Sequence, residues 1–449
     1  MAPPLKLPPQ NVEAEESVLG ALMIDKNAII KVSDLLKPED FYKSAHGNIY
    51  DEILRLYEQN QPVDILSVTS RLKENNRLEA IGGSSYLSKL INSVPTASHI
   101  DHYAKIVKDK KILRDLISAS SEITEKAFEP NDNIDEILDE IEQRIFSISQ
   151  SSQSQRFINI KEELKGAYER IEKLHSGGGA FRGIPTGFAQ LDNILSGLQN
   201  SDLVIVGARP SLGKTSFVLD IARYVAIKKK HPIGIFSLEM SKEQIIDRLI
   251  AAEAEIPLWK LRTGRLSSDT DFELIQSALD TLSQASIFVE DAPFLNILQM
   301  RSMARRLQMD QGLSLLIIDY LQLLQPRRNS DNMVQQITEI SRGLKGLARE
   351  LNIPVIAVSQ LSRAVDQREI RIPRLADLRE SGSIEQDADV VLFIYRKDRD
   401  KSSVAPEEEN IAEIIISKHR NGPLGTARLR FDPEKASFKN IDTYHQGPA

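Results

Sequence analysis

Cysteine is absent from the 449 residues of the chain. This absence excludes disulfide bonds, zinc ribbons, iron–sulfur clusters and a cysteine nucleophile, and it suits a reducing cytoplasm. Long hydrophobic runs are also missing, since the longest ones, such as Leu203–Val206 and Leu315–Ile318, have only the length of a strand. This length excludes a membrane-spanning protein. The opening Met1-Ala2-Pro3-Pro4 lacks the charged and then apolar pattern of an export signal.

The charge balance lacks the basic excess that is common in nucleic-acid-binding proteins, because the formal net charge is −7. A nucleic-acid binder of this kind must concentrate its positive charge locally, since the field of the whole molecule repels phosphate. Hydrophobic residues make up 41% of the chain and charged residues 27%. This composition excludes a disordered or collagen-like chain, and the length fits two or three domains.

Residues 1–150 are predicted to form an all-helical domain, with a globular part at about 1–105 and a helical hairpin at about 99–148. Apolar residues recur at helical spacing in Glu15–Ile24 and Asn133–Ser147, and Asp64 is placed to cap a helix. His99–Phe128 is long enough for an extended helix that pairs with the last one. Such apolar stripes indicate core packing or, alternatively, a surface for a partner.

Residues 151–182 are predicted to be a linker. Ser149–Gln155 contains only serine and glutamine, and Ser176–Gly179 forms a second flexible break. Between them, the spacing of Ile160, Leu164 and Tyr168 predicts a helix over 160–174 with one apolar face. An isolated helix of this length is marginal in water, so we expect it to dock on its own domain or on a neighbouring subunit.

Residues 183–449 alternate short β-branched runs with helical stretches, which predicts an α/β domain with a mostly parallel sheet covered by helices. The expected strands are Leu203–Val206, Ile233–Leu238, Leu315–Ile318, Val355–Val358, Val390–Tyr395 and Ile411–Ser417.

A phosphate-binding loop is the strongest chemical signal in the chain. The strand Leu203–Val206 leads through Arg209–Thr215 into a helix that begins near Ser216. Backbone N–H groups of such a loop surround phosphate oxygens, and the lysine reaches the β- and γ-phosphates while the threonine hydroxyl binds Mg²⁺. The first glycine of the strict pattern is replaced by Ala208, a modest departure. The candidate ATP-binding residues are Ser211, Gly213, Lys214, Thr215 and Ser216.

Polar residues at the ends of three other expected strands complete the candidate site. Asp319 follows a buried strand and is expected to join the magnesium shell. Glu239 ends the next strand after the phosphate loop, and we expect it to activate water, although a helix-capping role is the alternative. Gln360 can sense the γ-phosphate or simply cap. Arg248, on the helix after Glu239, is a weaker candidate for contact with the base or ribose.

Two cations close a late strand at a tight Asn-Gly-Pro turn. Lys418 and Arg420 alternate along the strand end, so they point the same way. A solvated pair at a hairpin tip is the alternative interpretation. In a ring-shaped ATPase, such a pair would reach the γ-phosphate of the neighbour.

The candidate DNA surface is Ser362–Gly382, where arginines are interleaved with acidic residues just after the strand that carries Gln360. Its small, polar end at Arg379, Glu380 and Gly382 can present backbone N–H groups to phosphates. Arg327 and Arg328 could join it from another loop, which the sequence leaves open. A purely solvated arginine-rich loop is the alternative.

These motifs closely resemble, in order and over nearly the whole chain, the bacterial replicative DNA helicase family, DnaB, whose opening is also similar to Pro8–Glu15. The seven motifs are Gly183–Phe188, Arg209–Thr215, Phe236–Met240, Ile318–Leu323, Ser359–Arg363, Asp377–Gly382 and Lys418–Pro423. The resemblance implies a RecA-like ATPase domain over 183–449, an N-terminal collar, and a linker helix that packs on the adjacent subunit. It also implies a homohexamer that uses ATP and Mg²⁺ to move 5′-to-3′ on single-stranded DNA, with primase and a helicase loader as partners.

The same resemblance assigns roles to the candidate residues. Lys214 and Thr215 would bind phosphate and magnesium, Glu239 would activate water, and Asp319 with Gln360 would complete the site. Lys418 and Arg420 would act across the subunit interface, and Arg379, Glu380 and Gly382 would hold the DNA backbone.

Other functions fit parts of the pattern. A recombination or repair ATPase would not need the helical collar and tethered helix, and one repair relative needs a four-cysteine zinc ribbon that this chain cannot form. An ATP-dependent scaffold or loader could dispense with Glu239 and with Lys418 and Arg420. A fused primase is disfavoured because His46, His99 and His102 stand apart. We expect a bacterial cytoplasmic protein, although a plastid genome could also encode it.

Overall fold

The computed structural model describes residues 7–94, 99–128, 181–266, 269–325, 333–368, 371–399 and 408–441, with isolated residues between 137 and 172 and at 405. The chain divides into two compact units, Met1–Glu162 and Glu163–Ala449. Within the described ranges, no helix is long and apolar enough to cross a membrane.

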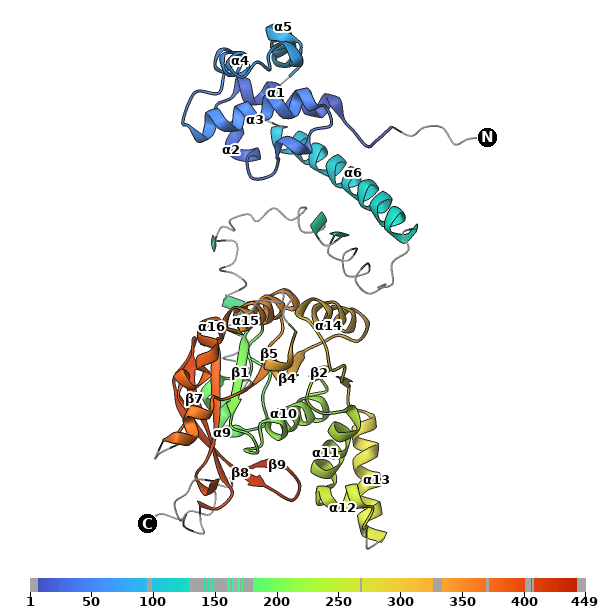
Figure 1. Ribbon diagram of the computed structural model, residues 1–449, viewed down its shortest axis with the longest axis vertical. Helices are drawn as coiled ribbons and strands as arrows, with labels where there is room; N and C mark the ends of the chain where they lie inside the picture. Colours follow the sequence, from blue (N-terminus) through green and yellow to red (C-terminus); the bar gives the residue numbers. More distant parts are fainter. Residues whose placement is uncertain are drawn as a thin grey trace, which may run out of the picture. The chain divides into compact units, whose positions relative to one another are not determined.

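The first unit is helical, as predicted (Figure 1). Asn11 caps the first helix by accepting a hydrogen bond from the N–H of Ala14, and Asp64 caps another by accepting from the N–H of Ser67, which confirms Asp64 as a cap. Buried aliphatic side chains such as Leu22 form one core. The helices are α1 (Val12–Ile24), α2 (Ala28–Val32), η1 (Pro38–Asp40), α3 (Ser44–Glu58), α4 (Ile65–Glu74), η2 (Glu79–Ile81), α5 (Gly83–Asn92) and α6 (Ile100–Phe128).

The long helix expected from His99 is present as α6. The second arm of the expected hairpin and most of the expected helix over 160–174 lie outside the described residues. The described side chains of Ile160, Leu164 and Tyr168 are exposed.

The second unit contains one nine-stranded sheet with the order β3-β2-β4-β5-β1-β6-β7-β8-β9. The strands from β3 to β6 in this order run parallel, and β7, β8 and β9 add an antiparallel edge. The strands are β1 (Leu203–Ala208), β2 (Ile233–Ser237), β3 (Ile287–Glu290), β4 (Leu315–Asp319), β5 (Val355–Gln360), β6 (Val390–Arg396), β7 (Ile411–His419), β8 (Gly425–Asp432) and β9 (Ser437–Asn440).

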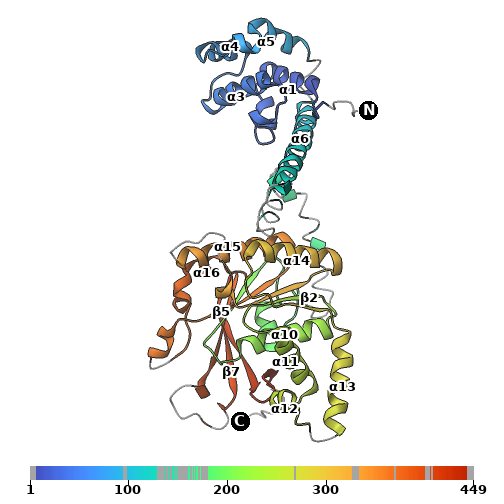
Figure 2. The ribbon, with the colours of Figure 1, turned by 45° about the vertical axis from the view of Figure 1, so that its right-hand side comes forward.

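Helices cover both faces of this sheet (Figure 2). One core packs the sheet against α9 (Ala189–Leu195), α10 (Lys214–Lys228) and α11 (Lys242–Ala254). The other packs it against α14 (Ile297–Gln311), α15 (Met333–Leu351) and α16 (Gly382–Asp387). The remaining helical segments are α12 (Leu258–Thr263), α13 (Asp269–Ser283), η4 (Leu321–Leu323), η5 (Arg363–Gln367), η6 (Leu375–Ser381) and η7 (Lys397–Arg399).

All six expected strands are present, and the sheet is mostly parallel as predicted. Three strands were not anticipated. β3 is short and only partly buried at the sheet edge, and β8 and β9 are the final antiparallel strands, in which buried and exposed residues mix. β8 and β9 lack the continuous apolar run that marks the central strands, and the run of β3 is only the three residues 287–289.

Candidate nucleotide and DNA sites

The phosphate-binding loop joins the end of β1 to the start of α10. All six residues of β1 are buried, so the strand is fixed in the sheet and the loop projects from its C-terminal end. Gly213 has a φ of +96°, and a Cβ at this position would lie 2.9 Å from the Phe438 ring and 3.1 Å from the Phe431 ring. Only glycine fits both the left-handed backbone and this space. The structure places Ser211 exposed on the loop and begins α10 at Lys214.

Glu239 and Asp319 reach Lys214 because their strands are neighbours. β2 pairs in parallel with β4, and Ser237 lies opposite Asp319. Both carboxylates therefore leave the sheet at the edge where the phosphate loop begins. The Nζ atom of Lys214 donates to Oε2 of Glu239 at 3.0 Å and lies 4.0 Å from Oδ1 of Asp319. The same ammonium lies 3.8 Å from the centre of the Tyr320 ring, a cation–π contact.

Asp319 and Thr215 form a buried oxygen cluster beneath this lysine. The hydroxyl of Thr215 donates to Oδ2 of Asp319 at 2.5 Å. Burial raises the pKa of Asp319, although Thr215 and Lys214 oppose the rise. Within the described part of the chain, Oδ1 of Asp319 is buried without a hydrogen-bond partner. Mg²⁺ prefers oxygen ligands, and the carboxylate of Asp319, with its unsatisfied Oδ1, and the hydroxyl of Thr215 provide them, so these residues fit that cation.

Arg248 also belongs to this cluster. From α11 its Nη1 atom donates to the hydroxyl of Ser216 at 3.1 Å, at the first turn of α10. Burial and the charge of Arg262 lower the pKa of Arg248, while Asp319 and Glu239 oppose the change. The structure thus brings Ser216 and Arg248 together beside the phosphate loop.

Gln360 lies at the end of β5, directly opposite Ala208 at the end of β1. Its backbone is held by the side chain of Gln322, which accepts from the Gln360 N–H at 3.3 Å and donates to the Gln360 carbonyl at 3.1 Å. The exposed side chain of Gln360 therefore starts from a fixed backbone next to the phosphate loop.

The candidate DNA segment forms η5, η6 and the start of α16. The backbone of Arg379 and Glu380 lies in η6, and Gly382 begins α16. Their side-chain contacts, and all of Arg327 and Arg328, lie outside the described residues. Arg368, one of the arginines of this segment, makes a bidentate pair with Asp377 through its guanidinium, so part of the segment's positive charge is neutralised within it.

One contact between the two candidate sites was missed by the sequence. Arg209, in the phosphate loop, pairs through Nε and Nη2 with the carboxylate of Asp366 in η5, and its Nη1 donates to the carbonyl of Leu361 at 2.8 Å. The phosphate loop is therefore tied directly to the DNA segment. The sequence signal available beforehand was that Arg209 lies in the phosphate loop and Asp366 in the candidate DNA segment.

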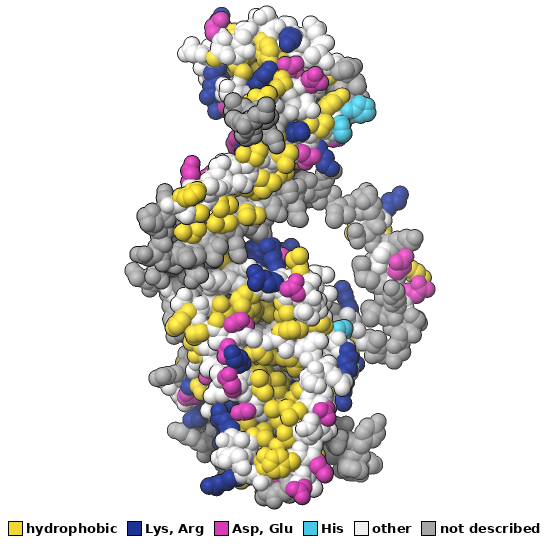
Figure 3. Space-filling view, turned by 90° about the vertical axis from the view of Figure 1, so that its right-hand side faces the viewer, with side chains coloured by type: hydrophobic (Ala, Val, Ile, Leu, Met, Phe, Trp, Pro, Cys, Tyr) yellow, Lys and Arg dark blue, Asp and Glu magenta, His cyan; other side chains and the backbone are white. Residues whose placement is uncertain are grey.

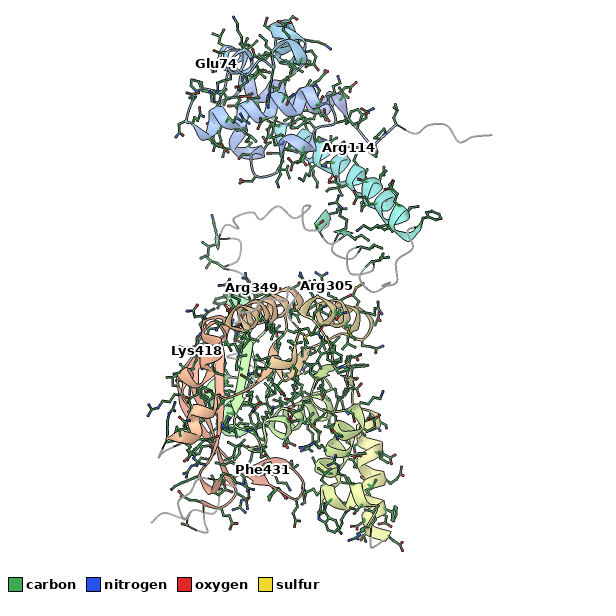
Figure 4. The ribbon with its side chains drawn as sticks, in the orientation of Figure 1. Glu74, Arg114, Arg305, Arg349, Lys418 and Phe431 are labelled. Atoms are coloured by element: carbon green, nitrogen blue, oxygen red, sulfur yellow. The ribbon has the colours of Figure 1, made fainter. Side chains whose placement is uncertain are left out.

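Lys418 and Arg420 do not meet the phosphate loop of their own chain. Lys418 lies opposite Val391, near the start of β6, because β7 runs antiparallel to β6. Val391 in turn lies opposite Ile205, three residues before the end of β1 where the phosphate loop begins, which is about 10 Å along the strand at 3.3 Å per residue. Arg420, whose N–H donates to the Asp389 carbonyl, lies near the level of Leu203, about 17 Å along the strand from that end. Figure 4 shows Lys418 and Phe431, which lies beside Gly213, near opposite ends of the sheet.

Comparison with known proteins identifies the family to which this arrangement belongs. The model of the DnaB-like helicase N terminal domain matches residues 7–109, and that of the DnaB-like helicase C terminal domain matches residues 183–440. Replicative DNA helicase DnaB of Geobacillus stearothermophilus is 47% identical over 439 residues, which is 97% of this chain and 96% of that protein. Replicative DNA helicase DnaC of Bacillus subtilis is 46% identical over the same shares.

Solved structures agree with the sequence matches. A structure described as a DnaB-like replicative helicase and its interactions with primase superposes with a TM-score of 0.78 at 35% identity, covering 96% of this chain and all of that one. A second solved structure, of an ATPase domain, covers 64% of this chain at 40% identity with a TM-score of 0.60. The chain belongs to the DnaB-like helicase family and is a replicative DNA helicase.

Proposed function

We propose that six copies of this chain form a ring that hydrolyses ATP at its subunit interfaces, moves 5′-to-3′ along single-stranded DNA and unwinds the duplex. The proposed ring rests on one observation: Lys418 and Arg420 lie at the strand ends of the sheet that are opposite to the phosphate loop. A phosphoryl group in transfer needs such cations beside its developing charge. They are then supplied by the next copy, and family membership supports the hexamer and the direction.

Each residue of the cluster has a role in this proposal. Lys214 binds the β- and γ-phosphates, and the Thr215 hydroxyl and the Asp319 carboxylate, whose Oδ1 is unsatisfied, would hold Mg²⁺. The bound cation supplies charge neutralisation on the phosphates. Glu239 accepts the proton of the attacking water, because it is the half-exposed carboxylate nearest to Lys214. Gln360 senses the γ-phosphate and Arg248 contacts the nucleoside.

The domain boundaries enter the same proposal, with a collar at 1–150, a linker at 151–182 and the ATPase domain at 183–449. Exposed apolar side chains gather on the face that carries α13 (Figure 3). Trp259 of α12 is 50% exposed, and Phe272 and Leu274 of α13 are 59% and 49% exposed. We propose that the helix over 160–174 of a neighbouring copy covers this face, since its own apolar residues need a partner.

DNA binds the segment 362–382, with Arg379, Glu380 and Gly382 at the backbone. The Arg209–Asp366 pair supports this assignment, because it lets the phosphate loop and the DNA segment move together. Primase and a helicase loader are the expected protein partners, and the bacterial cytoplasm is the expected location.

Mixed rings test the shared site. Lys214→Ala and Arg420→Ala subunits should each be nearly inactive alone. In rings assembled from equal amounts, about a quarter of the interfaces pair an intact phosphate loop with an intact Arg420, so ATPase activity should return. A mixture of Lys214→Ala with Glu239→Gln is the matched control, because both defects lie on one side of the interface and nothing should return.

The result that contradicts the ring site is the absence of recovery in the first mixture while mass measurement confirms mixed rings. Strand displacement by the parent protein separates a helicase from a scaffold or loader that hydrolyses ATP without unwinding.

A further inference from the structure

Arg420 is held by one buried carboxylate. Its Nη1 atom donates to Oδ1 of Asp389 at 3.2 Å, and its backbone N–H donates to the Asp389 carbonyl at 2.9 Å. The Arg420 side chain is 55% exposed, whereas that of Asp389 is 3% exposed. The contact therefore fixes one side of an exposed guanidinium and leaves the rest of it facing outward.

The other oxygen of Asp389 is anchored inside the sheet. Oδ2 accepts the N–H of Leu203 at 2.9 Å and also accepts from the ammonium of Lys345. Leu203 is the first residue of β1, the strand that carries the phosphate loop. With Oδ2 held by two donors, the carboxylate cannot rotate freely, so Oδ1 presents a fixed acceptor to Arg420.

Lys418 is held by residues that lie just before Asp389 in the chain. Its Nζ atom donates to the carbonyls of Glu385 at 2.5 Å and Gln386 at 3.2 Å, in the last turn of α16. That turn is fixed in turn by Asp387, whose carboxylate accepts from the hydroxyl of Ser341 in α15 at 2.8 Å. Residues 385–389, which follow the candidate DNA segment, thus hold both cations.

We propose that Asp389 is a positioning residue for catalysis in the neighbouring subunit, because it holds Arg420 in the geometry that meets the γ-phosphate. The inference rests on the proposed shared site. A long surface arginine samples many rotamers, and each misplacement weakens charge stabilisation at the transferred group. A buried carboxylate with one oxygen committed to the backbone removes part of this freedom before the phosphate arrives. It also places a negative charge beside two cations that repel each other.

The substitution Asp389→Asn tests this role. The amide oxygen should turn toward the Leu203 N–H and Lys345, which leaves the amide N–H₂ facing Arg420, where donor meets donor. We expect kcat for ATP to fall about tenfold, the size expected for one lost hydrogen bond to a charged group, while KM for ATP stays near the parent value. Glu413→Gln is the matched control, since it removes a carboxylate of the same strand β7 that pairs with Arg428 and not with Arg420, and its kcat should stay within a few-fold of the parent value.

Two further readouts separate positioning from a structural role. Mixed with Lys214→Ala subunits, Asp389→Asn subunits should recover activity, as Arg420→Ala subunits do. The double variant Asp389→Asn/Arg420→Ala should be no slower than Arg420→Ala alone, because the carboxylate acts only through the arginine. Damage to β1 would instead affect the subunit's own phosphate loop, so mixing would restore nothing and the two losses would multiply.

The outcomes are distinguishable. Recovery with Arg420→Ala but not with Asp389→Asn, or multiplied losses in the double variant, overturns the role of Asp389 and leaves the shared site intact. No recovery with Arg420→Ala overturns the shared site and this inference with it. If Asp389→Asn does not fold, Asp389→Asn/Lys345→Met replaces it, since removing both charges leaves no partly buried lysine without a counter-charge. The same recovery and the same non-multiplying loss are expected.

Discussion

Replacing Glu239 by glutamine should move nucleotide binding and turnover in opposite directions. Glu239 now accepts the hydrogen bond from Lys214 at 3.0 Å, so the carboxylate and a bound phosphate compete for one ammonium. Glutamine keeps the size of the side chain but loses its charge and its ability to accept a proton. Lys214 is then released for phosphate, while the attacking water loses its base.

The exposure of the pair sets the size of the binding effect. The Glu239 side chain is 47% exposed, so its ion pair with Lys214 belongs among the weak, partly solvated ones at about 0.2–1 kcal/mol. Releasing Lys214 should therefore tighten Kd for ATP by a factor of about 1.4 to 5. Loss of general-base catalysis should lower turnover by about 10² or more.

Titration with a non-hydrolysable ATP analogue and steady-state ATPase with single-stranded DNA measure the two effects separately. Glu243→Gln, an exposed carboxylate at the first turn of α11, is the control and should change neither quantity by more than a few-fold. Turnover of Glu239→Gln within a few-fold of the parent would show that another carboxylate is the base. Weaker ATP binding by Glu239→Gln would show that Glu239 does not compete with the phosphate for Lys214.

Two other measurements test the charges outside the cluster. The affinity for single-stranded DNA should fall steeply with salt and should not depend on sequence. Arg379→Ala should weaken binding to all sequences alike and make the salt dependence shallower. A strong sequence preference, or an unchanged affinity of Arg379→Ala, would refute the proposal that DNA binds the segment 362–382. Burial, with Asp389 nearby, raises the pKa of Asp202 to about 6, against the opposing charges of Lys345, His419 and Arg420. Because the folded state then binds a proton at higher pH than the unfolded state, stability is lost as the pH rises through about 6. Asp202→Asn should thus raise the free energy of unfolding at pH 7 by about 1 kcal/mol, a value reduced because Asp202 is partly exposed, and should change it little at pH 4. An equal change at both pH values would show that the pKa of Asp202 is not raised in the folded state.

The convergence of Glu239 and Asp319 on Lys214 could be predicted because it depends on where the strands end. β1, β2, β4 and β5 are buried runs in a parallel sheet, so the residues that follow them meet at one edge. The carboxylates of Glu239 and Asp319 converge on Lys214 for this reason alone. No local pattern was needed beyond four apolar runs and the glycine-lysine-threonine turn.

Contacts between loops could not be predicted in the same way. Arg209 and Asp366 are separated by 157 residues, and their pairing depends on how η5 folds back beside β1. Arg368 and Asp377 looked like parts of one exposed charged surface, yet they hold the segment together. Charged residues in a loop have no periodicity, so composition cannot tell a solvated arginine from a paired one.

The direction of β7 determines whether Arg420 can reach the phosphate loop of its own chain. If β7 ran parallel to β6, its end would lie beside the phosphate loop, and Arg420 could serve its own nucleotide. Because β7 is antiparallel, its end instead lies beside Asp389 and the start of β1. In the proposed shared site, a single chain would therefore carry both halves of the site but hold them at opposite strand ends of one sheet. We expect a lone subunit to bind ATP and to turn it over poorly, and activity to rise with ring formation rather than with nucleotide affinity. An ATPase rate per subunit that does not change with protein concentration across the assembly transition would contradict this argument.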